Sequence, residues 1–470
     1  MASRELSTKG LMRPSRRTSI VVCLAAALGA GGFAQVSASA SGVGSGCPAP
    51  RCATAAAVRT GSPLLVGSTS ATLAGAVMAH GARTSSYFQY GSGAALTKRT
   101  RISYTPATHG RVLMRVRVTD LAEATSYRFR IVARNHYGAS YGVPVAFSTT
   151  TQRKVLWGAQ IGPQFTGTAA PWDMNAVTAF QRTIGKAPSI VTMNIPFQGC
   201  SRSCNYYAFP ALQLAAIRSY GAIPMLNWAS MSSPLTVNEP NFRLANVTGG
   251  TFDSYIRSFA LATKAWGHPF FLRFNWEMNG TWFPWAEAAN GNQPGDYVAA
   301  WRHVHDIFTS VGATNVTWVW CPNVDPYHQY GSLAALYPGS AYVDWTCLDG
   351  YNFGTQTSAK GWPMFDQIYS ATYNQIVRTI APGKPFMIGE VASSEHGGSK
   401  AAWITDMISK ITSGYTALRA VVWFDWRQGG DWPIETSSAS TAAFAQGIAA
   451  PLFTTNTFGD LGPGTIQPPG

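Results

Sequence analysis

Charge is scarce in this 470-residue sequence, and a long apolar segment is missing. Only 12% of the residues are charged, and the longest apolar candidate, Ile20 to Ala34, is short for a bilayer span and lies near the N-terminus. The segment GAQIGPQFTG does not fit GxGxxG, and no nucleotide loop, Ser-His-Asp set or cofactor motif stands out. We therefore expect no membrane partner, no cofactor and no metal.

Acidic residues are also few, with 21 against 35 basic ones, and the imbalance is local. Residues 151–470 carry 18 of each sign, whereas residues 41–150 carry twelve basic residues against Asp120 and Glu123. A nucleic-acid enzyme would place its basic charge around its working site, so no nucleic-acid partner is predicted. We interpret the basic segment mainly as a solvated face, with weak contact to an acidic wall or surface polymer as the alternative.

The first forty residues are organised like an export signal. Three arginines precede the apolar stretch IVVCLAAALGAGGFA, and residues 38–40, ASA, supply the small side chains that a signal peptidase accepts. Residues 1–40 are therefore predicted to be a signal peptide, and the protein is predicted to be secreted. The triplet SRR at residues 15–17 loosely resembles a twin-arginine signal, but Ser19 stands where a large apolar residue is more usual, which leaves the export pathway open.

Cysteine is uncommon, and its number is even once the signal is removed. In an exported protein an even number favours disulfides over free thiols. The short spacings suggest two local pairs, which leaves the last two cysteines for each other. A metal site is the weaker alternative, because the tight CxxC pairs and nearby histidines that zinc favours are missing. The predicted disulfides are Cys47–Cys52, Cys200–Cys204 and Cys321–Cys347.

Residues 53–150 alternate apolar and polar side chains over short stretches and contain no convincing helix. This pattern, with turn residues at short intervals, indicates a small β-sandwich that follows a Gly/Pro/Ser-rich linker at residues 41–52. The segment TDLAEATSYRFRIVARNHYGASYG resembles a fibronectin type III domain, with Leu121 and Tyr127 matching its leucine and corner tyrosine. Such modules are more often spacers or surface-binding units than catalysts.

Residues 154–452 have a different pattern, in which eight short apolar runs mostly alternate with helical stretches. This alternation predicts a parallel sheet closed into a (β/α)8 TIM barrel, with an open doubly wound sheet as the alternative. Residues 453–470 are rich in Gly, Pro and Thr without an apolar period, and they are predicted to be a disordered tail. The eight runs begin at Val155, Ile190, Ala222, Pro269, Val316, Trp345, Pro385 and Arg419.

Two glutamates stand at the ends of apolar runs, where a barrel of this kind carries its active site. The fourth run ends in NWEMNG, with Glu277, and the seventh ends in GE, with Glu390. A carboxylate that finishes a hydrophobic strand is partly desolvated, which raises its pKa and suits it to protonate a leaving group. Two carboxylates across a barrel mouth are the minimum apparatus for glycoside hydrolysis, so we interpret the pair as catalytic rather than as solvated loop residues.

The segment RFNWEMNGTWF, residues 273–283, resembles the signature of glycoside hydrolase family 26, barrel enzymes that include β-mannanases. Matches at IPMLNW, WVWCPN, YVDWTCLDGYN and KPFMIGE extend the resemblance over nearly all of residues 154–450. It implies a retaining double displacement, with Glu277 as acid/base and Glu390 as the nucleophile that forms a glycosyl-enzyme. Retention requires the two carboxyl groups to lie about 5 Å apart.

The same resemblance implies roles for residues around the pair. Tyr351 is similar to the tyrosine that orients the nucleophile, Arg273 to the arginine that holds the acidic site together, and Asp349 to a supporting acid behind it. Asn279 falls in the predicted cleft among the substrate-binding residues. Its glycosylation sequon is interpreted as a chance occurrence, because a glycan there would block the substrate.

Tryptophans are expected to provide flat faces for sugar rings. We place Trp282 first, with Trp228 and Trp423 beside it, and Trp426 competes with Trp423 because the strand register is open. Many family 26 enzymes have His before the acid/base, whereas this chain has Trp276. The exchange removes an acceptor and adds bulk, so it weakens the expectation of mannose specificity without touching the catalytic pair.

The sequence as a whole predicts a secreted, monomeric endo-glycanase that acts on a polysaccharide. The leading substrate is β-1,4-mannan, and mixed-linkage β-glucan or xylan is the alternative with the same mechanism. A non-catalytic carbohydrate-binding barrel is the alternative from another class. Its expected mark, the loss of one carboxylate, is absent from this sequence.

Overall fold

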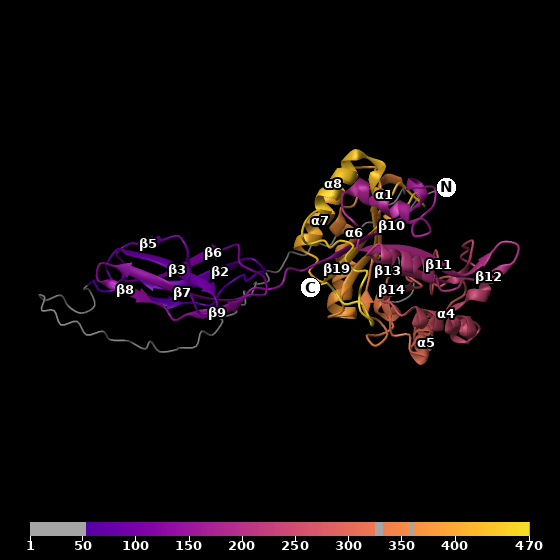
Figure 1. The fold of residues 1–470 in the computed structure, drawn as a ribbon, viewed down its shortest axis with the longest axis horizontal. Helices are drawn as coiled ribbons and strands as arrows, with labels where there is room; N and C mark the ends of the chain where they lie inside the picture. The colour runs from indigo at the N-terminus through magenta and orange to yellow at the C-terminus, as the bar shows by residue number, and fades with distance from the viewer. Residues whose placement is uncertain (1–52, 325–331, 357–360, 470) are drawn as a thin grey trace, which may run out of the picture.

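The computed structural model describes residues 53–324, 332–356 and 361–469. The predicted signal peptide, the linker and the Cys47–Cys52 pair lie outside these residues. Among the residues described, no helix is both long and apolar enough to cross a membrane. An all-β region and an α/β region follow one another along the long axis of the molecule (Figure 1).

The described residues ahead of the barrel form nine strands in two antiparallel sheets. One sheet has the order β1-β2-β6, and the other has the order β4-β3-β7-β8, with β5 and β9 added to β3 and β7. Side chains of β7 alternate between exposed and buried, and the buried ones pack with Leu73 and Phe88 in a shared core. The predicted strands are therefore present, while their assignment to the fibronectin type III family stays a prediction. Their bounds are β1 Ala57–Thr60, β2 Ala71–Met78, β3 Thr84–Ser92, β4 Lys98–Arg99, β5 Ser103–Thr105, β6 Arg111–Val118, β7 Ser126–Asn135, β8 Gly138–Tyr141 and β9 Val145–Ser148.

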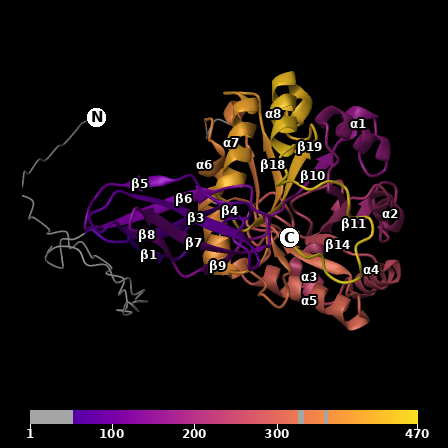
Figure 2. The same ribbon diagram turned by 60° about the vertical axis from the view of Figure 1, so that its left-hand side comes forward.

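The following region is a closed ring of parallel strands with helices outside it (Figure 2). β10 pairs with both β11 and β19, which closes the ring, and the sixth position is split into the short strands β16 and β17. Each of the eight apolar runs forms one position, so the predicted (β/α)8 barrel is confirmed. The ring consists of β10 Leu156–Ile161, β11 Ile190–Cys200, β13 Ile223–Ser233, β14 Phe270–Phe274, β15 Val316–Trp320, β16 Trp345–Thr346 with β17 Asp349–Asn352, β18 Phe386–Ser393 and β19 Leu418–Asp425; β12, Cys204–Tyr206, folds back on β11.

The helices begin and end at residues suited to those positions. Asp173 caps α1 by accepting from the backbone N–H of Asn175, and Ser399 caps α7 in the same way. Gly267 ends α4 with φ 75°, a left-handed conformation that glycine adopts without steric cost. The helices are α1 Met174–Ile184, α2 Ala211–Ser219, α3 Leu244–Thr248, α4 Asp253–Trp266, α5 Asp296–Val311, α6 Phe365–Gln375, α7 Lys400–Ser413 and α8 Ser438–Ile448.

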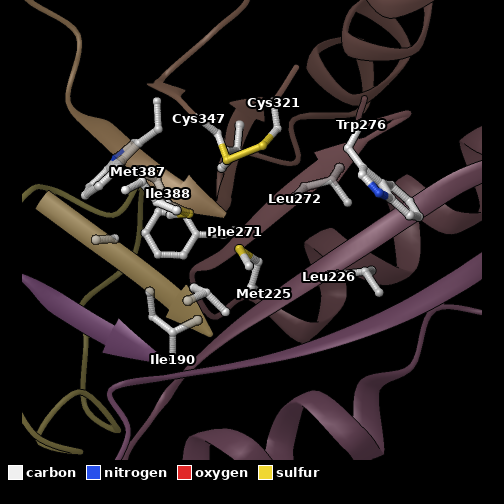
Figure 3. Close-up of a cluster of buried hydrophobic side chains, with 14 of the residues drawn as sticks. Ile190, Met225, Leu226, Phe271, Leu272, Trp276, Cys321, Cys347, Met387 and Ile388 are labelled. Atoms are coloured by element: carbon white, nitrogen blue, oxygen red, sulfur yellow. A yellow bond between two sulfur atoms is a disulfide. The ribbon is translucent and has the colours of Figure 1, made fainter. Parts of the chain in front are cut away.

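The barrel interior is apolar towards the strand beginnings and polar towards the strand ends. Ile190, Phe271 and Met387 belong to one cluster of buried side chains inside the ring (Figure 3). Side chains alternate along a strand, so Thr192 and Arg273 face the same interior one layer closer to the C-terminal ends. The polar site therefore stands on an apolar base of buried side chains.

Two predicted disulfides are present. Cys200–Cys204 ties β11 to β12, and Cys321–Cys347 joins the segments that follow β15 and β16. Figure 3 shows the second bridge beside the buried cluster of the barrel. It links neighbouring positions of the ring directly beneath the residues described below.

The C-terminal segment corrects one prediction. Residues 454–469 are not a free tail but run across the N-terminal ends of the barrel strands. The backbone N–H of Ile466 donates to the Thr317 hydroxyl (2.7 Å), and the Trp345 indole N–H donates to the Ile466 carbonyl (2.9 Å). The Ile466 side chain is only 4% exposed. The prediction of disorder was wrong for these residues because tertiary contacts, not a local apolar period, hold the segment.

Candidate active site

A cavity of about 640 Å³ opens at the C-terminal ends of the barrel strands, and both Glu277 and Glu390 line it. Its walls are mostly apolar, with many aromatic side chains and a small number of polar groups, which is typical of a site for an organic ligand. The aromatic lining residues are Trp172, Trp276, Phe283, Trp285, Tyr351, Phe353, Phe424, Trp426 and Trp432.

The segment after β14 brings Glu277 into the cavity through an unusual backbone. Asn275 and Glu277 have φ values of 47° and 54°, which non-glycine residues adopt only where surrounding contacts offset the cost. Here the Glu277 N–H donates to the Cys321 carbonyl (2.7 Å), and the Asn275 amide oxygen accepts from the Ser230 N–H (2.8 Å). The fold thus holds a strained turn in place at the point where the carboxyl group enters the cavity.

The Glu277 carboxylate is buried and has one donor on each oxygen. Asn323 Nδ2 donates to Oε1 at 2.7 Å, and the Trp282 indole N–H donates to Oε2 at 2.6 Å. Burial, followed by the nearby Glu390 charge, raises the pKa of Glu277 to about 7. A carboxyl group with a pKa near neutrality can both give and take a proton at working pH.

Glu390, in β18, faces Glu277 and is held by two different donors. Arg273 Nη1 donates to Oε1 at 3.0 Å, and the Tyr351 hydroxyl donates to Oε2. One carboxylate oxygen each of Glu277, Asp349 and Glu390 lie within 4.8 Å of one another. The two glutamates therefore lie next to each other in the cavity.

Arg273 ties the acidic groups together from below. Its side chain is completely buried, and its second terminal nitrogen pairs with Asp349, which is equally buried. Burial raises the pKa of Asp349 well above its ordinary range, and the Arg273 guanidinium offsets part of this effect. The same nitrogen lies 3.3 Å from Cys321 Sγ, so the disulfide forms part of the floor beneath the arginine.

Among the described residues, two sets of side chains near the cavity resemble a cation site: the three clustered carboxylates, and Cys321, Cys347 and Asp349. Arg273 already bridges two of them and supplies the compensating positive charge. The cysteines of the neighbouring set are joined to each other in the disulfide. Two of the three carboxylates are thus already paired with a protein cation, and both sulfur atoms are bonded to each other, so these donor sets are a poor fit for a metal ion.

Asn279 has a different place from the one predicted. It is 4% exposed and does not line the cavity; its amide pairs with the backbone of Asn323, donating to the carbonyl (2.9 Å) and accepting from the N–H (2.8 Å). Asn279 thus contacts Asn323, the residue that donates to Glu277. The prediction that Asn279 binds the substrate is corrected: it supports the site from behind. Asn323 itself was missed, although its position at the end of the fifth run was a usable signal.

The predicted sugar platforms are only partly where the sequence put them. Trp228 is fully buried between the barrel and α4, stacked on Phe259 with ring centroids 4.3 Å apart. Trp423 is 1% exposed and packs against Trp403 and Phe444 outside the ring. Both predictions were wrong, because these side chains project from the outer surface of their strands towards the helices.

Other aromatic residues face the cavity instead. Trp426, the competing candidate, lines it, and so does Trp276, which packs against Phe283 and Trp285. Trp282 directs its indole N–H at Glu277 and is not among the residues that line the cavity. Trp172, after β10, was missed because nothing in its local sequence marks it as part of the site.

The fold and the site together define a (β/α)8 protein with two opposed, buried glutamates in an aromatic cavity. Comparison with known proteins agrees with this description. Residues 251–416 match the model of glycosyl hydrolase family 26, a stretch that contains Arg273, Glu277, Asp349, Tyr351 and Glu390. This match supports a glycosidase.

A curated relative is named Endoglucanase H, from Acetivibrio thermocellus. It is 36% identical over 280 residues, which cover 59% of this chain and 29% of that protein. This chain thus spans less than a third of the length of that relative. Two solved structures, the mannanase BCman of Bacillus subtilis and an endo-β-1,4-mannanase of Cellulomonas fimi, are similar at 19% and 18% identity. The match to BCman covers 63% of this chain and 85% of that one, with a TM-score of 0.46. The match to the Cellulomonas fimi enzyme covers 67% of this chain and 76% of that one, with a TM-score of 0.48.

Proposed function

We propose that residues 154–452 form a retaining endo-β-glycanase domain that hydrolyses a polysaccharide. The observation that carries the proposal is the opposed pair, Glu277 and Glu390, whose nearest oxygens lie within 4.8 Å in one aromatic cavity. Inverting enzymes hold their carboxyl groups about 6.5–9.5 Å apart to admit a water molecule between them. The shorter separation favours direct attack on the sugar by one carboxylate.

The two glutamates have different surroundings, and these support different roles. Glu277, with a pKa near 7, protonates the glycosidic oxygen as the bond breaks, and later takes a proton from the attacking water. Glu390, fixed by Arg273 and Tyr351, attacks the anomeric carbon and forms the glycosyl-enzyme. Donors on both oxygens of each carboxyl group keep the pair aligned, which a double displacement needs.

The substrate that the sequence resemblance implies is β-1,4-mannan, and we propose it as the first candidate. A specific observation favours a second candidate, a β-glucan: the relative with 36% identity is named an endoglucanase. Trp276 bears on this choice, because it lines the cavity directly beside the acid/base. An indole at this position offers a hydrophobic face and a donor in place of the acceptor that a histidine provides.

The test is reducing-sugar release from mannan, galactomannan, mixed-linkage β-glucan and xylan. Glu277→Gln and Glu390→Gln are assayed beside the wild type, and each is expected to lose several powers of ten in rate. Asp306→Asn, an exposed carboxyl on α5 outside the cavity, serves as the matched control and should keep full activity. No release from any polysaccharide by the wild type would contradict the proposal and favour a carbohydrate-binding protein.

The N-terminal sheets, we propose, are a fibronectin type III-like module of a secreted, monomeric protein. Support comes from Tyr127, whose hydroxyl accepts from the backbone N–H of Ala122 at 2.8 Å. A tyrosine that bonds to the backbone a few residues upstream is a hallmark of this sandwich architecture. Detection of the protein in the culture medium, truncated near residue 40, would support export; full-length protein retained in cells would contradict it.

Residues 53–150 carry eleven basic residues against two acidic ones, which supports weak contact with an acidic wall polymer. Arg111, Arg115 and Arg117 are exposed on β6, an edge strand, and their even spacing places them on the same face of it. Replacing all three with Gln should reduce salt-sensitive retention on wall material without changing hydrolysis of soluble polysaccharide. Equal retention of both proteins would leave the module a spacer.

A further inference from the structure

Part of the cavity wall carries polar atoms that have no partner. Both amide atoms of Gln160 and the Thr192 hydroxyl make no hydrogen bond within the described part of the chain. Gln160 is 2% exposed and Thr192 is fully buried, yet both line the cavity. Buried polar groups are nearly always paired, because leaving one unpaired costs as much as losing a hydrogen bond. An unpaired group at a cavity therefore points to a ligand.

These atoms are neighbours by the register of the sheet. Ala159 pairs with Val191 between β10 and β11, so Gln160 and Thr192 follow side by side on the two strands. Two residues further along β11, Asn194 lines the same cavity and accepts from Asn227 Nδ2 at 2.7 Å. Asn227 Oδ1 is also buried without a partner. Three adjacent strands thus carry four neighbouring polar side chains, which we call the amide strip: Gln160, Thr192 and Asn194, which line the cavity, and Asn227, which lies behind Asn194.

The amide strip is neutral and offers both donors and acceptors. An amide group donates through nitrogen and accepts through oxygen, and a hydroxyl group does both. An ionic ligand would find no opposite charge on these four side chains, and an apolar ligand would leave their atoms unpaired. Neighbouring hydroxyl groups on a sugar ring can pair with the three members that line the cavity, Gln160, Thr192 and Asn194. The aromatic side chains of Phe424, on β19, and Trp426, just beyond it, line the same cavity and can cover the faces of the ring.

We infer that Gln160 and Thr192 bind hydroxyl groups of the sugar unit that enters the cavity most deeply, and that Gln160 is a specificity-determining residue of the site. The inference rests on the proposed function, since it identifies residues that select the sugar for the Glu277 and Glu390 pair. Discrimination through hydrogen bonds to hydroxyl groups is strong, because a sugar that lacks the matching group leaves the buried amide unpaired.

Two nearly isosteric variants test this inference. Gln160→Met and Thr192→Val remove polar atoms but keep the volume of the side chain, and removing an unpaired buried polar group leaves stability unchanged or raises it. We expect each to lower kcat/KM on the preferred polysaccharide by roughly tenfold or more, mainly through KM. Thr263→Val is the matched control: its buried hydroxyl on α4 has a partner, the Phe259 carbonyl at 2.9 Å. It should lower the melting temperature and leave KM unchanged.

Calorimetry gives a second readout. It measures the affinity of the Glu277→Gln variant for manno- and cello-oligosaccharides, with and without the additional Gln160→Met change. Weaker binding in the double variant, with an unchanged melting temperature, supports the inference. If the wild type cleaves polysaccharide and the Gln160 and Thr192 variants keep kcat/KM within twofold, the amide strip holds only water and the inference is overturned. A wild type that neither binds nor cleaves overturns the proposed function as well.

Discussion

Replacing Trp282 with Phe should move the alkaline limb of the pH–activity profile upwards. The Trp282 indole N–H donates to Glu277 Oε2 at 2.6 Å, and this hydrogen bond lowers the pKa of Glu277 because it stabilises the ionised form. A hydrogen bond to a charged group contributes about 1.5–3 kcal/mol, and one pKa unit corresponds to about 1.4 kcal/mol. The pKa of Glu277 in the variant should therefore rise by about one to two units from its value near 7.

The direction of the effect follows from the role of Glu277 in the first step. An acid must be protonated to give up its proton, so kcat/KM falls as pH rises through the pKa of Glu277 in the free enzyme. The assay is kcat/KM on the preferred polysaccharide between pH 4 and pH 10. Trp285→Phe is the matched control, because that indole donates at 2.7 Å to the Trp276 carbonyl and not to a carboxylate. An alkaline limb that stays in place or moves down in Trp282→Phe would refute the reasoning.

Three further perturbations address the stability of the site and of the barrel. Glu277→Gln should stabilise the protein at high pH. The pKa of Glu277 in the folded protein, about 7, lies above the ordinary 4.5. The stability that protonated Glu277 contributes is therefore fully present below pH 4.5 and is lost as the pH rises through 7. The increase in the free energy of unfolding of the variant over the wild type, measured with urea, should be about 3 kcal/mol larger at pH 9 than at pH 4. Equal increases at the two pH values would contradict this prediction. Gly389→Ala would place a Cβ 2.4 Å from Cys347 Sγ and 2.8 Å from Asp349 Oδ1, so it should destabilise the fold by about 1–3 kcal/mol and reduce activity, whereas Gly462→Ala, with open space around it, should do neither. Ile466→Ala should cost about 2–4 kcal/mol by the same urea assay, and an unchanged midpoint would show that the C-terminal segment contributes nothing to the barrel.

Much of the barrel was predictable from the sequence because its strands are buried on both faces. Such strands appear as short, continuous apolar runs between helical stretches, and each of the eight runs became one position of the ring. Glu277 and Glu390 could be singled out for the same reason, since a carboxylate at the end of an apolar run has few structural explanations. The closeness of their oxygens, by contrast, depends on strand register and on the left-handed turn at Asn275 and Glu277.

The wrong predictions for the tryptophans arose because the sequence does not show which face of a strand points into the barrel. Trp228 and Trp423 lie in runs that are apolar on both faces, so the pattern does not tell whether a side chain enters the barrel or packs on a helix. Residues 454–469 lack a local apolar period, and a single buried side chain, Ile466, with hydrogen bonds to strand beginnings holds them. Gln160 attracts no notice as a lone glutamine, and its importance follows only from burial without a partner.

The most direct test of the central claim is the stereochemistry of the first product. Proton NMR of a β-linked oligosaccharide during the first minutes of hydrolysis resolves the anomer released before it equilibrates in water. Two carboxyl groups whose nearest oxygens lie within 4.8 Å of each other favour two displacements, so the β-anomer should accumulate first. Initial release of the α-anomer would mean a single displacement by water and would contradict the assignment of Glu390 as the nucleophile.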